Sequence, residues 1–255
     1  MSGRTYGLPE TDGTSPVRKE NVLSGKPAGG AESAGTRGHG NRGAEIRGVL
    51  FALSVTLALL TGIIRFLAGN AGVMETEMLR FAPPEKTGLP ETEYSAMAAH
   101  ITDYLTGRTD SFQYFLTVSG GERIPCFHDY EMTHMADCRN LIRLDGIVCA
   151  VCTVLAALST RRMSLRGAGR ALYGLGIAAT VMVLWAIFNF DGLFVTFHRI
   201  AFRNDYWLLN PRTDLLIRLM PGTMFIDLGR KGLAVFAAGM GIFGGILWIA
   251  GRRNL

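Results

Sequence analysis

The chain has 255 residues and a formal net charge of +5, and 48% of its residues are hydrophobic. This length allows one domain or two small ones. The positive charge does not indicate nucleic-acid binding, because the basic residues form no surface pattern interleaved with aromatic residues. They gather instead beside apolar blocks, which favours a membrane protein.

The first 43 residues are rich in Gly, Ser, Thr, Pro and mixed charge, without an apolar period. Segments of this composition cannot bury enough apolar surface to fold alone. We therefore predict a disordered cytoplasmic tail over residues 1–43. The apolar block 48–68 lies far from the start of the sequence and has no clear cleavage site, so we interpret it as a retained first span.

Four apolar blocks separated by polar segments predict four transmembrane helices. A helix needs about 20 apolar residues to cross the hydrocarbon core. The second block is short as an uninterrupted stretch, 146–158, and we retain it because four spans fit the flanking charges. We expect an all-α integral membrane four-helix bundle with a small extracytoplasmic α+β cap. The expected spans are residues 44–68, 138–160, 171–190 and 232–255.

The distribution of Lys and Arg predicts the orientation of these spans. Seven basic residues precede the first block, and the loop 161–170 carries four Arg and no acid. Residues 69–145, by contrast, contain six basic and twelve acidic residues. By the positive-inside rule we expect both termini and the loop 161–170 in the cytoplasm. The segments 69–137 and 191–231 then face outward together.

The outer segment 69–137 is predicted to form the cap. A helix is expected to begin near Pro90 and to stop at Gly107, with apolar residues at helical spacing between them. Alternating apolar residues over 112–118 predict a strand, and 124–127 can return beside it after a glycine turn. In the second outer segment, apolar residues at 215–220 predict a further short helix.

Two Phe-His pairs, at 127–128 and 197–198, each lie beside an apolar span, and three of the five histidines fall in these two regions. If both regions lie on one side of the membrane, two imidazoles can meet at its surface. Imidazole is the side chain best suited to move protons near neutral pH. Ionisable clusters at membrane depth are costly and are usually functional, although a single interfacial histidine is often only structural.

In the first region, His128, Glu131, His134 and Asp137 recur every three residues. On an α-helix this spacing spreads the side chains over about half of the circumference, which is poor geometry for one metal site. We therefore expect no metal. A carboxylate beside a histidine, as Glu131 can be, holds the imidazole tautomer and raises its basicity.

The four cysteines give little information. Cys149 and Cys152 lie inside an apolar span and are interpreted as small packing residues. Cys126 and Cys138 both fall in the outer segment, and the sequence leaves open whether they pair.

The pattern Phe-His-x-x-Glu-x-x-His-Met-x-Asp at 127–137 resembles a signature of the lipoprotein intramolecular transacylase family. The second region resembles it as well, and the resemblance covers residues 48–250. The tail has no counterpart in the family pattern. The matching residues of the second region are Asp191, Phe197, His198, Phe202, Asn204, Asp205, Trp207, Pro211, Asp214 and Pro221.

This resemblance implies an enzyme of the bacterial plasma membrane that acts on diacylated lipoproteins. It moves the sn-2 acyl chain of the diacylglyceryl-modified N-terminal cysteine to the cysteine α-amino group, which gives the lyso-form. We expect no cofactor, no nucleic-acid partner and a monomer in the lipid bilayer, with the active site on the outer face.

For this reaction we assign His128, His198 and Glu131 as catalytic residues. One imidazole would be the base and the other the acid or oxyanion donor, and either order is open. His134 and Asp137 are supporting candidates. No Gly-x-Ser-x-Gly elbow is present, and an amine that attacks an ester on the same molecule needs no enzyme nucleophile. The expected substrate-binding residues are Arg199, Arg203, Asn204, Asp205, Trp207, Asp191 and Tyr130.

Two other interpretations remain open at this point. A non-enzymatic assembly or sensor protein would use the cap to bind a partner and the histidines as a pH-sensitive or structural pair. A metal-dependent membrane hydrolase would need bound metal for activity. Transport is disfavoured, because the spans contain no broken helices with paired charges.

Overall fold

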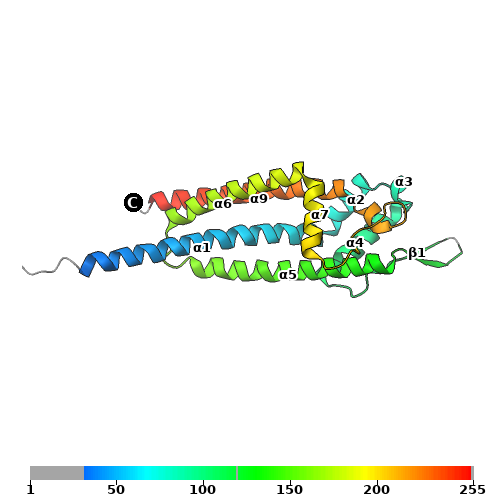
Figure 1. The fold of residues 1–255 in the computed structure, drawn as a ribbon, viewed down its shortest axis with the longest axis horizontal. Helices are drawn as coiled ribbons and strands as arrows, with labels where there is room; N and C mark the ends of the chain where they lie inside the picture. Colours follow the sequence, from blue (N-terminus) through cyan, green and yellow to red (C-terminus); the bar gives the residue numbers. More distant parts are fainter. Residues whose placement is uncertain (1–31, 119, 254–255) are drawn as a thin grey trace, which may run out of the picture. The chain divides into compact units, whose positions relative to one another are not determined.

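The computed structural model describes residues 32–118 and 120–253, most of which are helical (Figure 1). Two short strands interrupt the helical order. The elements are α1 (Glu32–Gly69), α2 (Ala71–Phe81), α3 (Pro84–Thr87), the 3₁₀ helix η1 (Glu91–Glu93), α4 (Tyr94–Thr106), β1 (Phe115–Thr117), β2 (Arg123–Pro125), α5 (Asp129–Ser159), α6 (Leu165–Phe188), α7 (Phe190–Ala201), α8 (Leu215–Leu219) and α9 (Gly222–Arg253).

Helices α1, α5, α6 and α9 are long and apolar enough to cross a membrane, so the prediction of four helices of membrane-spanning length is confirmed. The helices extend beyond the expected spans: α5 begins at Asp129 rather than 138, and α9 begins at Gly222 rather than 232. An established helix adds residues without a new nucleation cost, so it continues past the apolar segment into polar sequence.

The same extension affects the predicted tail over residues 1–43. Helix α1 already begins at Glu32, so residues 32–43 are helical where we expected disorder. The remainder of the predicted tail, residues 1–31, lies outside the described residues.

The membrane helices α1, α6 and α9 share one apolar core. Gly48 permits the close approach of α1 to the start of α6, because a Cβ at this position would lie 2.9 Å from the backbone atoms Ala168 N and Ser164 O. Small residues at such crossings are the usual device for packing membrane helices. The buried members of this core are Phe51, Ala52, Val55, Ala168, Leu172, Phe236, Met240 and Leu247.

A second core lies at the other end of the long helices and combines α2, α4 and α8 with the starts of α5 and α9. Tyr94 is fully buried there, and its hydroxyl donates to the Ala82 carbonyl. Gly107, with φ of 81°, ends α4 in the left-handed conformation, as predicted. Helix α2 was not predicted. It begins at the cap of Asn70, whose Oδ1 accepts from Val73 N at 3.0 Å.

The hairpin predicted beyond α4 is present. Strands β1 and β2 are antiparallel, with Phe115 opposite Pro125 and Thr117 opposite Arg123. Helix α6 ends at Phe188, and α7 begins at Phe190 and lies across the direction of the long helices (Figure 1). The chain therefore turns at the end of the third span, and this turn places His198 beside α5.

Candidate active site

His128 is the N-terminal cap of α5, and Glu131 is the third residue of the same helix. One carboxylate oxygen, Glu131 Oε2, accepts from the backbone N–H of His128 at 2.8 Å and lies 2.9 Å from His128 Nδ1. Glu131 is fully buried, whereas the His128 side chain is 55% exposed. This is the returning half of a capping box, in which the third residue satisfies the capping backbone N–H. The buried carboxylate therefore holds an imidazole that is exposed at the surface.

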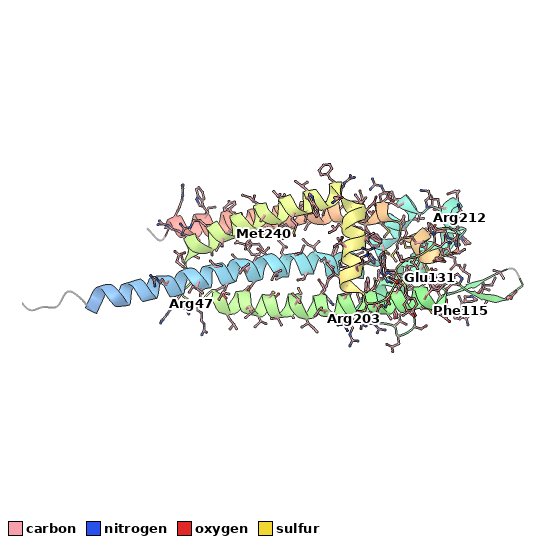
Figure 2. All side chains as sticks on the ribbon, in the orientation of Figure 1. Arg47, Phe115, Glu131, Arg203, Arg212 and Met240 are labelled. Carbon is pink, nitrogen blue, oxygen red and sulfur yellow. The ribbon has the colours of Figure 1, made fainter. Side chains whose placement is uncertain are left out.

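The second oxygen of Glu131 ties this helix to α8. Oε1 accepts from the backbone N–H of Leu216 at 2.9 Å. This N–H belongs to the first turn of α8 and has no partner within that helix, so a carboxylate there is favourable. Both oxygens of Glu131 are thereby fixed, which holds the bond to His128 Nδ1 in one geometry. Figure 2 shows Glu131 among many side chains at one end of the long helices, whereas Met240 lies toward their other end.

Asp214 and Tyr130 form a further layer next to His128. The Tyr130 hydroxyl donates to Asp214 Oδ1 at 2.7 Å, and its ring stacks on the His128 ring with centroids 5.3 Å apart. Asp214 Oδ1 also lies 4.0 Å from His128 Nδ1. Two carboxylates consequently face one side of the same imidazole.

The Asp214 carboxylate, which is 1% exposed, is held ionised by its neighbours. Burial alone would raise its pKa. Hydrogen bonds from the Thr213 and Tyr130 hydroxyls and from the Asn210 backbone N–H outweigh this, so the pKa of Asp214 lies below its ordinary value. The three donors lie 2.6, 2.7 and 2.7 Å from its oxygens.

His198 is buried among aromatic rings from α7 and from the segment that follows it. Its nearest ring is Phe194, at 4.0 Å between centroids, followed by Trp207 at 4.9 Å. Nδ1 lies 2.7 Å from the Phe194 carbonyl, which can only accept, so Nδ1 carries the proton. Burial lowers the pKa of His198 below its ordinary value, although the bond to the carbonyl opposes this. The ring is thus neutral near pH 7, with Nε2 as an acceptor.

The histidine that His198 contacts is His134. Their ring centroids are 5.8 Å apart, and Phe202 packs edge-on against His134 at 5.1 Å. His134 Nε2 lies 3.6 Å from Cys138 Sγ, while its buried Nδ1 has no hydrogen-bond partner among the described residues. The ring contacts of His198 in the described chain do not include His128, so the structure forms two histidine groups, His128–Glu131 and His134–His198.

The other predicted site residues divide into connected and exposed side chains. Asn204 Nδ2 donates to Asp137 Oδ2 at 2.8 Å and so joins α5 to the segment after α7. Trp207 is buried against His198. The remaining residues make no side-chain hydrogen bond within the described part of the chain and are exposed: Asp191, Arg199, Arg203 and Asp205. Figure 2 labels Arg203 near the end of the bundle that carries Glu131.

Cys126 and Cys138 are both free thiols in the structure, as are Cys149 and Cys152. Burial raises the pKa of the Cys126 thiol, which keeps it protonated. The described residues also contain no group of three or more His, Cys, Asp or Glu side chains placed to hold a metal ion. The expectation that the protein uses no metal stays a prediction.

Sequence reasoning did not assign a role to Asp214 or to the Leu216 backbone, although both complete the His128 group. A signal was present, since Asp214 directly precedes the apolar Leu215-Leu216 pair, and Asp is a preferred residue at helix starts. That position could have suggested a carboxylate at a helix N-terminus, but not its contact with Tyr130.

The sequence model of the family described as lipoprotein intramolecular transacylase Lit matches residues 49–225. The chain belongs to the lipoprotein intramolecular transacylase family. The interpretation of the sequence as a membrane transacylase is confirmed, and the non-enzymatic assembly or sensor interpretation does not fit this membership. No curated protein sequence matches the chain.

Solved structures share the fold. The membrane integral Lit of Bacillus cereus is 17% identical, with a TM-score of 0.67 over 85% of this chain and 98% of that one. A variant of that protein with one histidine replaced by arginine gives a TM-score of 0.66 at 17% identity, covering 89% of this chain and 100% of the other. At this identity the likeness establishes the fold.

Proposed function

We propose that this chain transfers the sn-2 acyl group of a diacylglyceryl-modified N-terminal cysteine to the α-amino group of that cysteine. The product is an N-acylated lyso-form lipoprotein. The observation that carries this proposal is the His128–Glu131 pair, in which a buried, fixed carboxylate holds an exposed imidazole. Such a pair is suited to accept a proton from an amine and return it to an alkoxide.

His128 is the general base in this proposal. The carboxylate of Glu131 accepts a hydrogen bond from the Nδ1–H of His128, which leaves the Nε2 lone pair free toward the exposed side of the ring. The substrate α-amino group has an ordinary pKa near 8, so a useful fraction is neutral at physiological pH. Imidazole, with an ordinary pKa near 6.5, is matched to take the proton that this nitrogen loses.

The reaction then proceeds within one substrate molecule. The amine nitrogen attacks the carbonyl carbon of the sn-2 ester, a C–N bond forms, and His128 Nε2 takes the proton. The tetrahedral intermediate collapses with cleavage of the C–O bond to glycerol, and the imidazolium returns its proton to the departing alkoxide. Asp214 and Glu131 stabilise the imidazolium between these steps. Because amine and ester belong to one molecule, their alignment supplies much of the rate.

His198 takes a different part from the one that sequence reasoning left open. A neutral ring whose Nδ1 proton is bound to the Phe194 carbonyl has no N–H left for an oxyanion. We propose that Nε2 of His198 accepts a hydrogen bond from the substrate. The exposed guanidinium groups of Arg199 and Arg203 are then the candidates for binding the developing oxyanion.

The surrounding residues are proposed as the binding surface for the substrate. Trp207 packs on His198 and supplies an apolar wall, and Tyr130 holds the His128 ring by stacking. Asn204 fixes the segment after α7 to Asp137 on α5. Asp191, in the first turn of α7, and Asp205, in the segment after α7, are exposed carboxylates that are proposed to contact the polar end of the lipoprotein.

The orientation that we propose follows from charge. Both termini and the loop around 161–170 face the cytoplasm, while the core of α2, α4 and α8 with the β1–β2 hairpin forms an extracytoplasmic cap. We expect the enzyme to act as a monomer in the bacterial plasma membrane. Single cysteines introduced into a cysteine-free variant at Glu122 and Arg162 would test this. An impermeant thiol reagent added to whole cells should label the first position and not the second.

The activity is tested in a bacterial host that lacks its own lipoprotein N-acyltransferase. Mass spectra of the N-terminal lipopeptide of an abundant lipoprotein should show the N-acylated lyso-form when the wild-type chain is expressed. With His128→Ala the diacyl form should remain. An unchanged diacyl form in the presence of folded wild-type protein would contradict the proposed function.

A further inference from the structure

A cavity of about 660 Å³ lies where α1, α2 and α9 meet, and it contains none of the histidines described above. Its walls are largely apolar. Leu59, Ile63 and Phe66 line it from one face of α1, and Val235 lines it from α9. Its volume is in the range of small-molecule and cofactor sites. Part of its lining comes from α1 and α9, which are long and apolar enough to cross a membrane.

Glu77 and Lys231 are the charged residues that line this cavity. Glu77 is 1% exposed, and its Oε1 accepts from Lys231 Nζ. Its second oxygen, Oε2, is buried without a hydrogen-bond partner among the described residues. A buried carboxylate oxygen left without a donor is costly, so this position favours a ligand that brings an N–H or O–H.

The charges around Glu77 narrow the choice of ligand. Lys231 also lies 3.0 Å from Asp227, which in turn pairs with Arg80 at 3.1 Å. Two acids and two bases give the cluster no net charge, so an ion of either sign gains little from it as a whole. Lys231 and Arg80 are nevertheless 47% and 58% exposed at their side chains and keep free N–H groups. The cluster therefore suits a zwitterion, with a cationic donor toward Glu77 and an anion toward Lys231 and Arg80.

We propose that this cavity binds a phospholipid whose headgroup carries a primary ammonium. The ammonium would donate to Glu77 Oε2, the phosphate would meet Lys231 and Arg80, and one acyl chain would lie along the apolar face of α1. A phosphocholine headgroup fits less well because its nitrogen has no N–H. An anionic phosphoglycerol headgroup fits less well because it brings no cation to the buried carboxylate. The site is separate from the residues proposed for transacylation and does not depend on that function.

The test compares three lipids with identical acyl chains on the full-length protein in detergent. Native mass spectrometry would measure retention of phosphatidylethanolamine, phosphatidylcholine and phosphatidylglycerol. We expect the ethanolamine lipid to bind at least fivefold more tightly than either of the others. Equal retention of the ethanolamine and choline lipids by the wild-type chain would overturn the proposal.

Gly62 offers a way to block the cavity without disturbing the core. It lines the cavity, and a Cβ at this position would meet no atom within 4 Å. Gly62→Leu should therefore reduce binding of the ethanolamine lipid about tenfold. Gly241→Leu is the matched control, because Gly241 is equally open, lies on α9 and does not line the cavity. Wild-type lipid binding by Gly62→Leu would also overturn the proposal.

Glu77→Gln tests the headgroup separately from the chain. The loss of the carboxylate charge should reduce the preference for the ethanolamine lipid over the choline lipid to less than twofold. If Glu77→Gln folds poorly, Gly62→Leu still tests the proposal. A synthetic diacylglyceryl-cysteine lipopeptide provides the last comparison. If it displaces the ethanolamine lipid from the wild-type chain but no longer binds to Gly62→Leu, the cavity belongs to the substrate and the proposal is wrong.

Discussion

The carboxylate of Glu131 lies against the backbone N–H of Leu216, with 2.9 Å between Oε1 and the nitrogen, although the residues are 85 positions apart. The same carboxylate holds His128 through its other oxygen. One buried side chain thus serves as a helix cap, as a link between α5 and α8, and as the partner of the proposed base. Its loss should affect stability and activity together.

Glu131→Gln tests this dual role. The amide replaces one acceptor oxygen by an NH₂ group, which would face either the Leu216 N–H or the His128 backbone N–H. We expect a loss of about 1–3 kcal/mol in stability, as for a buried donor left without its partner. Lyso-form production should fall about 10²-fold or more, the range for impaired acid–base catalysis. Thermal unfolding in detergent and lipopeptide mass spectra measure the two effects.

Glu122→Gln is the matched control for that experiment. Glu122 lies exposed in the turn of the hairpin, so the same chemical change there should alter neither quantity. Full activity of a folded Glu131→Gln protein would remove the carboxylate from the mechanism.

Tyr130 and Asp214 should act as a coupled pair. Tyr130→Phe removes the hydroxyl that donates to Asp214 Oδ1, and Asp214→Asn removes the charge that faces His128. We expect each change to lower activity, and the double variant to lose less than the sum of the two. A coupling free energy of about 1 kcal/mol is typical of residues in one network. A double-mutant cycle on the rate of lyso-form production measures it, and strict additivity would contradict the network.

Gly48 should be intolerant of a larger side chain. A Cβ at this position would lie 2.9 Å from two backbone atoms at the start of α6, and backbone cannot move aside as a flexible side chain can. Gly48→Val should therefore destabilise the protein by about 1–3 kcal/mol, the usual cost of overpacking. Gly174→Val on α6 is the control, since its Cβ would meet open space. Equal unfolding temperatures for the two variants would disprove the close crossing.

Much of the fold was predictable, because local physics determines it. Apolar blocks of membrane length predicted the four long apolar helices, and α4 ends at Gly107, where a helix stop was expected. Helix α2 was missed, since its signal is weaker. It is amphipathic over only 11 residues, and its burial depends on Met74 and Met78 meeting a core that other segments supply.

The site was predictable as a set of residues but not as an arrangement. The spacing of His128 and Glu131 on one helix start suggested their contact, which the structure contains. The pairing of His134 with His198 depends on how α7 turns across the bundle after Asn189. No local sequence pattern predicts that turn. For the same reason the sequence could not show that His198 Nδ1 donates its hydrogen bond to the Phe194 carbonyl.

Stability should fall on mild acidification because of His198. Burial lowers its pKa in the folded state, so the unfolded chain takes up a proton first as the pH drops through the ordinary value of 6.5. Stability then decreases as the unfolded state binds more protons. The lowered pKa of Asp214 acts in the same direction but only near and below its ordinary value of 3.8.

Between pH 7 and 5 the unfolding temperature should therefore decline. The decline should be less steep in His198→Gln, because glutamine does not titrate there. His134 faces the same ring and also titrates, so the variant should flatten the decline without abolishing it. Parallel declines for wild type and His198→Gln would show that His198 is not held neutral by burial.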